Sequence, residues 1–248
     1  GALLAKADLE SLDGNRDKAL TLVEQLVGLA PDAPGPVVLR GDIHMRAKQF
    51  DEAEKTYRAA LAKVPTGQVL MKLYGALKLG GKSEQARSEL EALHQENPND
   101  NTVRLALASI QQEEGKDGSA TEGYEKVLAA SPNNVIALNN VAWLYFNDGE
   151  PKALEFAKRA YDLAPRHPSI ADTYGWFLVE SGKVQQGLTI LKRAARDAPN
   201  TLEIQYHLAV AYAKSGERNK AKPLLQRVVD AEEGLTFKAA AERLLKTM

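Results

Sequence analysis

The sequence of 248 residues contains no cysteine, no long apolar run and no marked excess of either charge. The absence of cysteine excludes disulfides, thiolate catalysis and cysteine-ligated zinc. No apolar run approaches the roughly 20 residues that a membrane-spanning helix needs, so we expect no transmembrane segment. The formal net charge of -1 leaves no surplus of basic residues to neutralise phosphates, so we expect no nucleic-acid partner.

Patterns of reactive residues are missing as well. The chain has no glycine-rich phosphate loop, no G-x-S-x-G turn and no H-E-x-x-H helix, and no two of its four histidines stand at metal-binding helical spacing. An active site needs such a convergent set of groups. We therefore expect no catalysis, no metal and no cofactor.

The composition, with 26% charged and 44% hydrophobic residues, is typical of a folded protein. The sequence does not start with the positively charged and then apolar stretch of a signal peptide, because Gly1 leads directly into residues with helical spacing. We expect any export signal to lie upstream of Gly1.

What the sequence does contain is a repeat of 33 or 34 residues. Prolines recur at this spacing, a small residue stands twelve residues before each of them, and a glycine usually lies five residues earlier still. Several coincidences at one period indicate a repeat protein. The members are Pro31, Pro65, Pro98, Pro132, Pro165 and Pro199; Ala19, Ala53, Ala86, Ala120, Ala153, Gly187 and Ala221; and Gly14, Gly81, Gly115, Gly182 and Gly216.

Each unit is predicted to form two amphipathic helices joined by a tight turn. The glycine ends the first helix and the proline ends the second. Small residues are predicted where the two helices cross, since overpacking by a larger side chain would cost about 1–3 kcal/mol. No unit can bury its apolar face alone, so stability is expected to come from stacking on neighbouring units. In the first helices the small residues are Ala7, Gly41, Ala108, Ala142, Gly175 and Ala209.

These units resemble tetratricopeptide (TPR) repeats, most clearly in "LRGDIHMRAKQFDEAEKTYRAALAKVP" and "LNNVAWLYFNDGEPKALEFAKRAYDLAP". The resemblance covers essentially the whole chain and implies an all-α fold, a right-handed α-solenoid. Seven repeats are expected over residues 1–33, 34–66, 67–100, 101–134, 135–167, 168–201 and 202–234. A capping helix over residues 235–248 is expected to close the array.

Three positions depart from the repeat pattern. Lys48 replaces the turn glycine of the second repeat, and Tyr74 occupies the small site of the third. Pro151 is predicted to start the second helix of the fifth repeat, where a missing N–H costs nothing. We expect locally altered crossing angles there, without loss of the fold.

In TPR arrays the first helices line the concave surface, and the resemblance places a distinctive set of side chains there. Two tryptophans and a tyrosine on successive repeats are expected there among side-chain amides and carboxylates. Such a surface suits an extended peptide, because the rings supply apolar contact area and the side-chain amides can hydrogen-bond the peptide backbone. Equally, Trp143 and Trp176 could pack between neighbouring helices, and the sequence leaves both interpretations open. The predicted partner-binding residues are Asn139, Asn140, Trp143, Phe146, Asp172, Trp176, Glu180, Tyr206, His207 and Val210.

The second half of the chain also resembles the C-terminal part of bacterial TPR proteins linked to exopolysaccharide production and exosortase (PEP-CTERM) sorting. Those proteins are often exported lipoproteins, so the resemblance implies a periplasmic or outer-membrane scaffold; a cytoplasmic location is the alternative. The expected function is a non-catalytic scaffold that binds a protein or peptide in its concave groove. Two alternatives stay open: a structural spacer that forms homo-oligomers through its N-terminal repeat, and an accessory domain of a larger enzyme.

Overall fold

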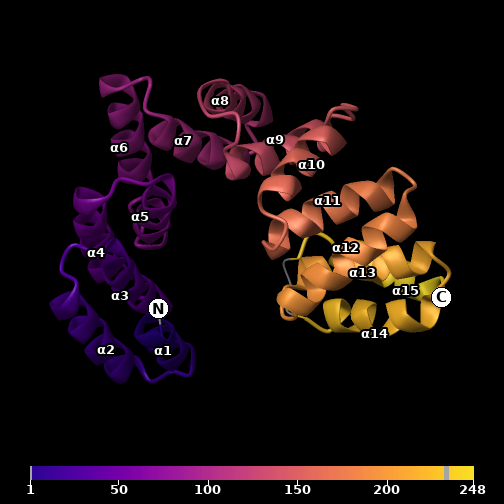
Figure 1. Ribbon diagram of the computed structural model, residues 1–248, viewed down its shortest axis with the longest axis horizontal. Coiled ribbons are helices and arrows are strands. Elements are labelled where there is room, and N and C mark those ends of the chain that lie inside the picture. Colours follow the sequence, from indigo (N-terminus) through magenta and orange to yellow (C-terminus); the bar gives the residue numbers. More distant parts are fainter. Residues whose placement is uncertain (1, 232–234) are drawn as a thin grey trace. The chain divides into compact units, whose positions relative to one another are not determined.

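The computed structural model describes residues 2–231 and 235–248, so the last three residues of the seventh predicted repeat lie outside the described residues. The described part of the chain forms α-helices and no strand (Figure 1). The all-α prediction is therefore confirmed. The helices are α1 (Ala2–Leu12), α2 (Arg16–Leu29), α3 (Pro34–Arg46), α4 (Phe50–Lys63), α5 (Gly67–Leu79), α6 (Ser83–Glu96), α7 (Asn101–Glu113), α8 (Asp117–Ala130), α9 (Val135–Asn147), α10 (Ala153–Leu163), α11 (Pro168–Glu180), α12 (Val184–Asp197), α13 (Leu202–Lys214), α14 (Arg218–Val229) and α15 (Lys238–Lys246).

The helices belong to two compact units, residues 1–123 and 124–248, whose boundary falls within α8. Within the units, consecutive helices pack as hairpins, such as α1 with α2, α3 with α4, and α11 with α12. Each hairpin also contacts the next one through pairs such as α2 with α3 and α12 with α13. No helix in the described ranges combines the length and apolarity that crossing a membrane requires.

The two helices of a hairpin approach most closely where the sequence predicts small residues. A Cβ atom added to Gly187 would lie 2.5 Å from the carbonyl oxygen of Gly175 and 2.6 Å from Cγ2 of Val179. A Cβ atom added to Gly41 would lie 2.4 Å from the Tyr57 ring. Because real Cβ atoms do not approach this closely, a larger residue at either glycine would force the helices apart.

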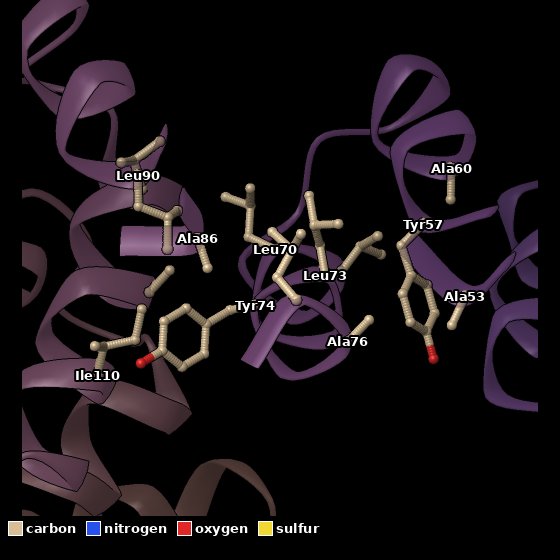
Figure 2. Packing of buried hydrophobic residues seen from close by; sticks show 14 of the residues in the cluster. Ala53, Tyr57, Ala60, Leu70, Leu73, Tyr74, Ala76, Ala86, Leu90 and Ile110 are labelled. Atoms are coloured by element: carbon tan, nitrogen blue, oxygen red, sulfur yellow. The ribbon is translucent and has the colours of Figure 1, made fainter. Parts of the chain in front are cut away.

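Tyr74 is the exception among these crossing sites. Its side chain is buried and belongs to a core cluster of the first unit with Leu73, Ala86 and Ile110. Figure 2 shows the ring extending from α5 toward Ile110 of α7. A cavity of about 20 Å³ lies between α5 and α6, lined by Tyr74 and by side chains of both helices.

The prediction for Pro151 was wrong by two residues, because α10 begins at Ala153. The Ala153 N–H donates to the carbonyl oxygen of Glu150 at 3.1 Å, which places Pro151 second in a four-residue turn. A proline suits that position since its fixed φ matches the backbone of common turns.

The C-terminal helix α15 lies within the predicted capping segment and packs against α14. Ala241 is fully buried, and Phe237, Leu244 and Leu245 pack against the same core cluster as Leu225 of α14. The helix thus covers apolar side chains that the last hairpin would otherwise expose.

The turns between the helices of a hairpin use the left-handed backbone conformation. Six glycines there have φ between 72° and 86°, and Lys48 adopts the same conformation with a φ of 56°. The turn still closes, since the Gln49 N–H donates to the carbonyl oxygen of His44 at 2.9 Å. The left-handed conformation strains any residue with a Cβ atom.

We expect Lys48→Gly to raise the free energy of unfolding by about 1 kcal/mol, because glycine adopts a positive φ without steric strain. Urea denaturation followed by circular dichroism measures the change. Lys55→Gly, in the exposed middle of α4, is the matched control and should lower the free energy of unfolding by about 1 kcal/mol. Equal destabilisation by both substitutions would show that the turn does not strain Lys48.

Candidate binding surface

The residues predicted to bind a partner all lie on three first helices of the second unit, α9, α11 and α13. The central helix α11 is tied to both neighbours by polar contacts. The Trp143 indole N–H of α9 donates to Thr173 Oγ1 at 3.0 Å, and His207 Nδ1 of α13 lies 2.8 Å from Asp172 Oδ2. These two bonds set the register of the three helices at this surface.

Asp172 and His207 form a buried polar pair, with 6% of each side chain exposed. The second carboxylate oxygen of Asp172, Oδ1, is also buried and has no hydrogen-bond partner in the described part of the protein. Buried polar atoms are normally paired, because removing them from water without a partner is unfavourable. The pair is therefore an unusual feature for the interior of a helical repeat.

Aromatic rings surround this pair. The Trp176 and His207 rings stack with centroids 4.3 Å apart, and Tyr206 lies 6.3 Å from Trp176. On the α9 side, Phe146 stacks on Phe177 at 4.3 Å. We call the set Trp143, Phe146, Trp176, Tyr206 and His207 the aromatic surface.

Trp143 and Trp176 were each expected either to pack between helices or to face a partner, and each side chain has a packed part and an accessible part. Trp143 packs edge-on against Phe177 at 4.9 Å, and Trp176 stacks on His207, so both rings contribute to helix packing. Both tryptophans nevertheless remain only half-buried. Each ring thus keeps an accessible part that is held rigidly by its packed part.

The two asparagines of α9 form a short polar chain. Asn139 donates to the Asn140 side-chain oxygen at 3.3 Å, and Asn140 donates to the hydroxyl of Tyr124 at 3.0 Å. The Asn139 side-chain oxygen is buried and accepts no hydrogen bond from the described residues. Asn140 therefore has a structural partner, whereas Asn139 keeps an unused acceptor.

The remaining predicted residues differ in how open they are. Glu180 is exposed and pairs with Lys214 at 2.6 Å. Burial, and then the negative charge of Glu180, raise the pKa of Tyr206, while Arg243 opposes them. Val210 is buried and lines a cavity of about 210 Å³ together with residues of the C-terminal segment.

The structure also shows a groove that sequence reasoning missed. It has a volume of about 550 Å³ and lies on the first unit, along the first helices of three hairpins. Arg46 pairs with Asp8 at 2.7 Å and Lys72 pairs with Asp42 at 2.6 Å, so the acidic groups at the groove are already neutralised. The lining residues are Leu4, Ala5, Asp8, Pro34, Gly35, Val38, Leu39, Asp42, Arg46, Val64, Thr66, Gln68 and Val69.

The sequence feature that corresponds to this groove is the presence of short side chains at repeated positions. Asp8 and Asp42 stand in the first two repeats at the positions that Trp143 and Trp176 occupy in the fifth and sixth. Ala5 and Gly35 widen the space further. A search for aromatic residues necessarily overlooks a site that is defined by small ones.

No cluster of three or more histidine, aspartate or glutamate side chains that could hold a metal ion occurs within residues 2–231 and 235–248. Stacked helical hairpins define the class of helical-repeat proteins. The family model described as tetratricopeptide repeat matches residues 12–73 and 178–244, more than half of the sequence. The chain belongs to the tetratricopeptide repeat family.

Comparison with known proteins gives distant relatives. Cellulose synthase operon protein C of Xanthomonas axonopodis pv. citri is 27% identical over 91% of this chain and 19% of its own length. Mouse tetratricopeptide repeat protein 21A is 25% identical over 64% of this chain and 12% of its own length. The chain therefore spans at most about a fifth of either curated relative.

A solved structure shares the fold. The Cut9 and Hcn1 hetero-tetramer of the APC/C contains a chain that matches 96% of this one, and 47% of its own length, with a TM-score of 0.68 and 16% sequence identity. At this identity the match supports the helical-repeat fold alone.

We expect His207→Ala to lower the free energy of unfolding by about 3 kcal/mol, because it leaves the buried Asp172 carboxylate without its partner. The double variant Asp172→Ala/His207→Ala should cost less than the two single changes added together, by about 1–2 kcal/mol. Urea denaturation of the four proteins measures this coupling. Strictly additive changes would mean that the two side chains do not stabilise each other.

Proposed function

We propose that this chain is a non-catalytic scaffold that binds an extended segment of a protein partner on its aromatic surface. The observation that carries the proposal is that Trp143 and Trp176 are both half-buried and held by contacts within the unit. Rigid aromatic rings offer a large contact area at a small loss of side-chain freedom on binding. Such rings are common among the residues that dominate the binding energy of interfaces.

Asn139, Asp172, Glu180 and His207 complement these rings in the proposal. Extended peptides carry unpaired backbone N–H and C=O groups that must find partners when the peptide leaves water. Asn139 and Asp172 each hold an acceptor oxygen that no described residue uses. Both oxygens are buried, so the groups that a peptide backbone can reach are the exposed Glu180 carboxylate and the partly exposed Asn139 side chain.

We further propose that the scaffold serves a bacterial envelope assembly for exopolysaccharide or protein sorting. The similarity to cellulose synthase operon protein C over 91% of the chain supports the exopolysaccharide part. The resemblance of the second half to exosortase-associated proteins supports the sorting part. In this role the chain would act as the binding segment of a larger protein.

A second proposal is self-association through the N-terminal hairpin. Leu9 and Leu12 of α1 are 58% and 64% exposed, and their spacing puts them on one face of the helix. An exposed pair of leucines on a terminal hairpin is a suitable contact for another apolar helix.

The first experiment captures partners from a bacterial envelope extract with the parent chain and with a Trp143→Ala/Trp176→Ala variant. A partner of the aromatic surface should be retained by the parent and lost by the variant, provided that circular dichroism shows the variant to be folded. The partner, once identified and purified, should then bind the parent directly. Leu29→Ala, at an exposed site on α2, is the control and should retain the partner.

A Trp143→Phe/Trp176→Phe variant covers the case in which the alanine variant unfolds, because phenylalanine keeps most of the ring packing. It should bind the partner more weakly than the parent, since it loses ring area and both indole N–H groups. Full binding by folded tryptophan variants would refute the aromatic surface as the binding site.

Self-association is tested by sedimentation velocity at several concentrations. The parent should sediment faster as its concentration rises, and Leu9→Ser/Leu12→Ser should remain monomeric because the apolar contact is lost. Leu79→Ser, which is 62% exposed on α5, is the matched control and should behave as the parent does. A parent chain that stays monomeric throughout the series contradicts this proposal.

A further inference from the structure

The groove on the first unit and two exposed leucines lie along the same side of α1. Leu4, Ala5 and Asp8 of this helix line the groove. Leu9 and Leu12, both more than half exposed, stand four residues after Ala5 and Asp8 respectively. Residues four apart are neighbours on one side of a helix, one turn from each other. The leucines therefore continue the groove-lining side of α1 by one further turn.

The groove is a hollow that suits apolar side chains. Its volume of about 550 Å³ falls within the range of about 300–1,000 Å³ that is usual for sites enclosing a drug-sized ligand. Val38 of α3 and Val69 of α5 line it, and so does Val64, whose side chain is 37% exposed. An apolar occupant would remove this surface from water, which is favourable.

The charged groups at the groove are paired within the unit itself. Arg46 pairs with Asp8 at 2.7 Å and donates to Ser11 Oγ at 2.9 Å, and Lys72 pairs with Asp42 at 2.6 Å. Two carboxylates and two cations leave no net charge there. A charged occupant would lose its water without finding a free counter-charge, so the groove favours an uncharged apolar group.

A hollow beside a protrusion on one face is complementary to a second copy of the same face. A two-fold axis brings each feature of one copy opposite a different feature of the other, as in the isologous interfaces of homodimers. When the axis passes between the groove and the leucines, the leucines of each copy meet the groove of the other. The absence of net charge at the groove allows the two copies to approach without repulsion.

We propose that two copies of this chain associate through this surface, with Leu9 and Leu12 of each copy inserted into the groove of the other. Two equivalent contacts then bury the leucines together with the groove lining. This inference rests on the self-association proposed above, and it names the site at which the leucines dock.

The first test blocks the groove. Ala5 is small and exposed, so Ala5→Lys leaves the core unchanged and places a long charged side chain in the groove beside Asp8. It should raise the dissociation constant of the dimer about tenfold, because the incoming leucines would have to bury a charge. Ala59→Lys, at an exposed site on α4, is the matched control and should associate as the parent does.

Sedimentation velocity over a concentration series measures the association, and circular dichroism checks that each variant is folded. Ala5→Gln covers the case in which Ala5→Lys fails to fold. It fills part of the groove without adding a charge, so it should weaken association by a smaller factor.

The second test mixes two variants with complementary defects. The Ala5→Lys protein keeps its leucines but lacks an open groove, whereas the Leu9→Ser/Leu12→Ser protein keeps its groove but lacks the leucines. Each variant alone should remain monomeric where the parent associates. A mixed dimer regains one of the two contacts, so the mixture should associate at a concentration at which neither variant does.

The mixture can be followed through one of its components. The sequence contains no cysteine, so a cysteine introduced by Lys222→Cys, at an exposed site of the second unit, carries a fluorescent label at a single position. The labelled leucine variant should sediment faster as the unlabelled Ala5→Lys protein is added. Addition of more unlabelled leucine variant is the control and should have no effect.

Three results overturn the inference. If the parent and a folded Ala5→Lys protein associate equally well, the leucines meet another surface, and self-association stands without the groove. If each folded variant is monomeric and their mixture is monomeric too at all concentrations at which the parent associates, the contact is not between leucines and groove. A parent chain that stays monomeric throughout removes both this inference and the self-association proposal, while the capture experiment still decides the aromatic surface.

Discussion

Close contact between the two helices of each hairpin is the constraint on which the rest of the structure depends. At Gly175 and Gly187 the backbones approach so closely that even a methyl group would meet a carbonyl oxygen. The left-handed glycine turns bring the helices into this contact, and stacking of hairpins then buries the apolar faces. Residues one repeat apart consequently fall side by side on neighbouring first helices.

This regular spacing lets one backbone pattern carry two different surfaces. The first helices of the first unit present short side chains, including Asp8 and Asp42, and enclose a groove. Those of the second unit present Trp143 and Trp176 at the equivalent positions and display rings instead. Side-chain volume at a repeated position therefore decides whether a unit offers a hollow or an aromatic face.

The buried pair of Asp172 and His207 lies beneath the surface that we propose binds a partner. A carboxylate in the interior is costly unless its charge and oxygens are satisfied, and here one oxygen remains unpaired. The same pair fixes α13 against α11, so it holds together the helices that carry the proposed binding surface.

The sequence by itself determined the all-α fold, the helical hairpins and the small residues at the helix crossings, and it marked Lys48 as the residue that replaces a turn glycine. These features depend on local conformation and on a period that is repeated several times. It also pointed to α9, α11 and α13, yet it left open whether Trp143 and Trp176 pack or face solvent. It misplaced the start of α10, because a proline near a helix start is compatible with both a turn and a first helical residue.

Only the tertiary structure decided that both tryptophans are half-buried, that Val210 is buried and that His207 pairs with Asp172. It alone revealed the groove on the first unit. The physical reason is that burial and pairing depend on which side chains neighbouring helices bring together. Asp172 and His207 are 35 residues apart in the sequence, and only the packing of α11 against α13 places their side chains in contact.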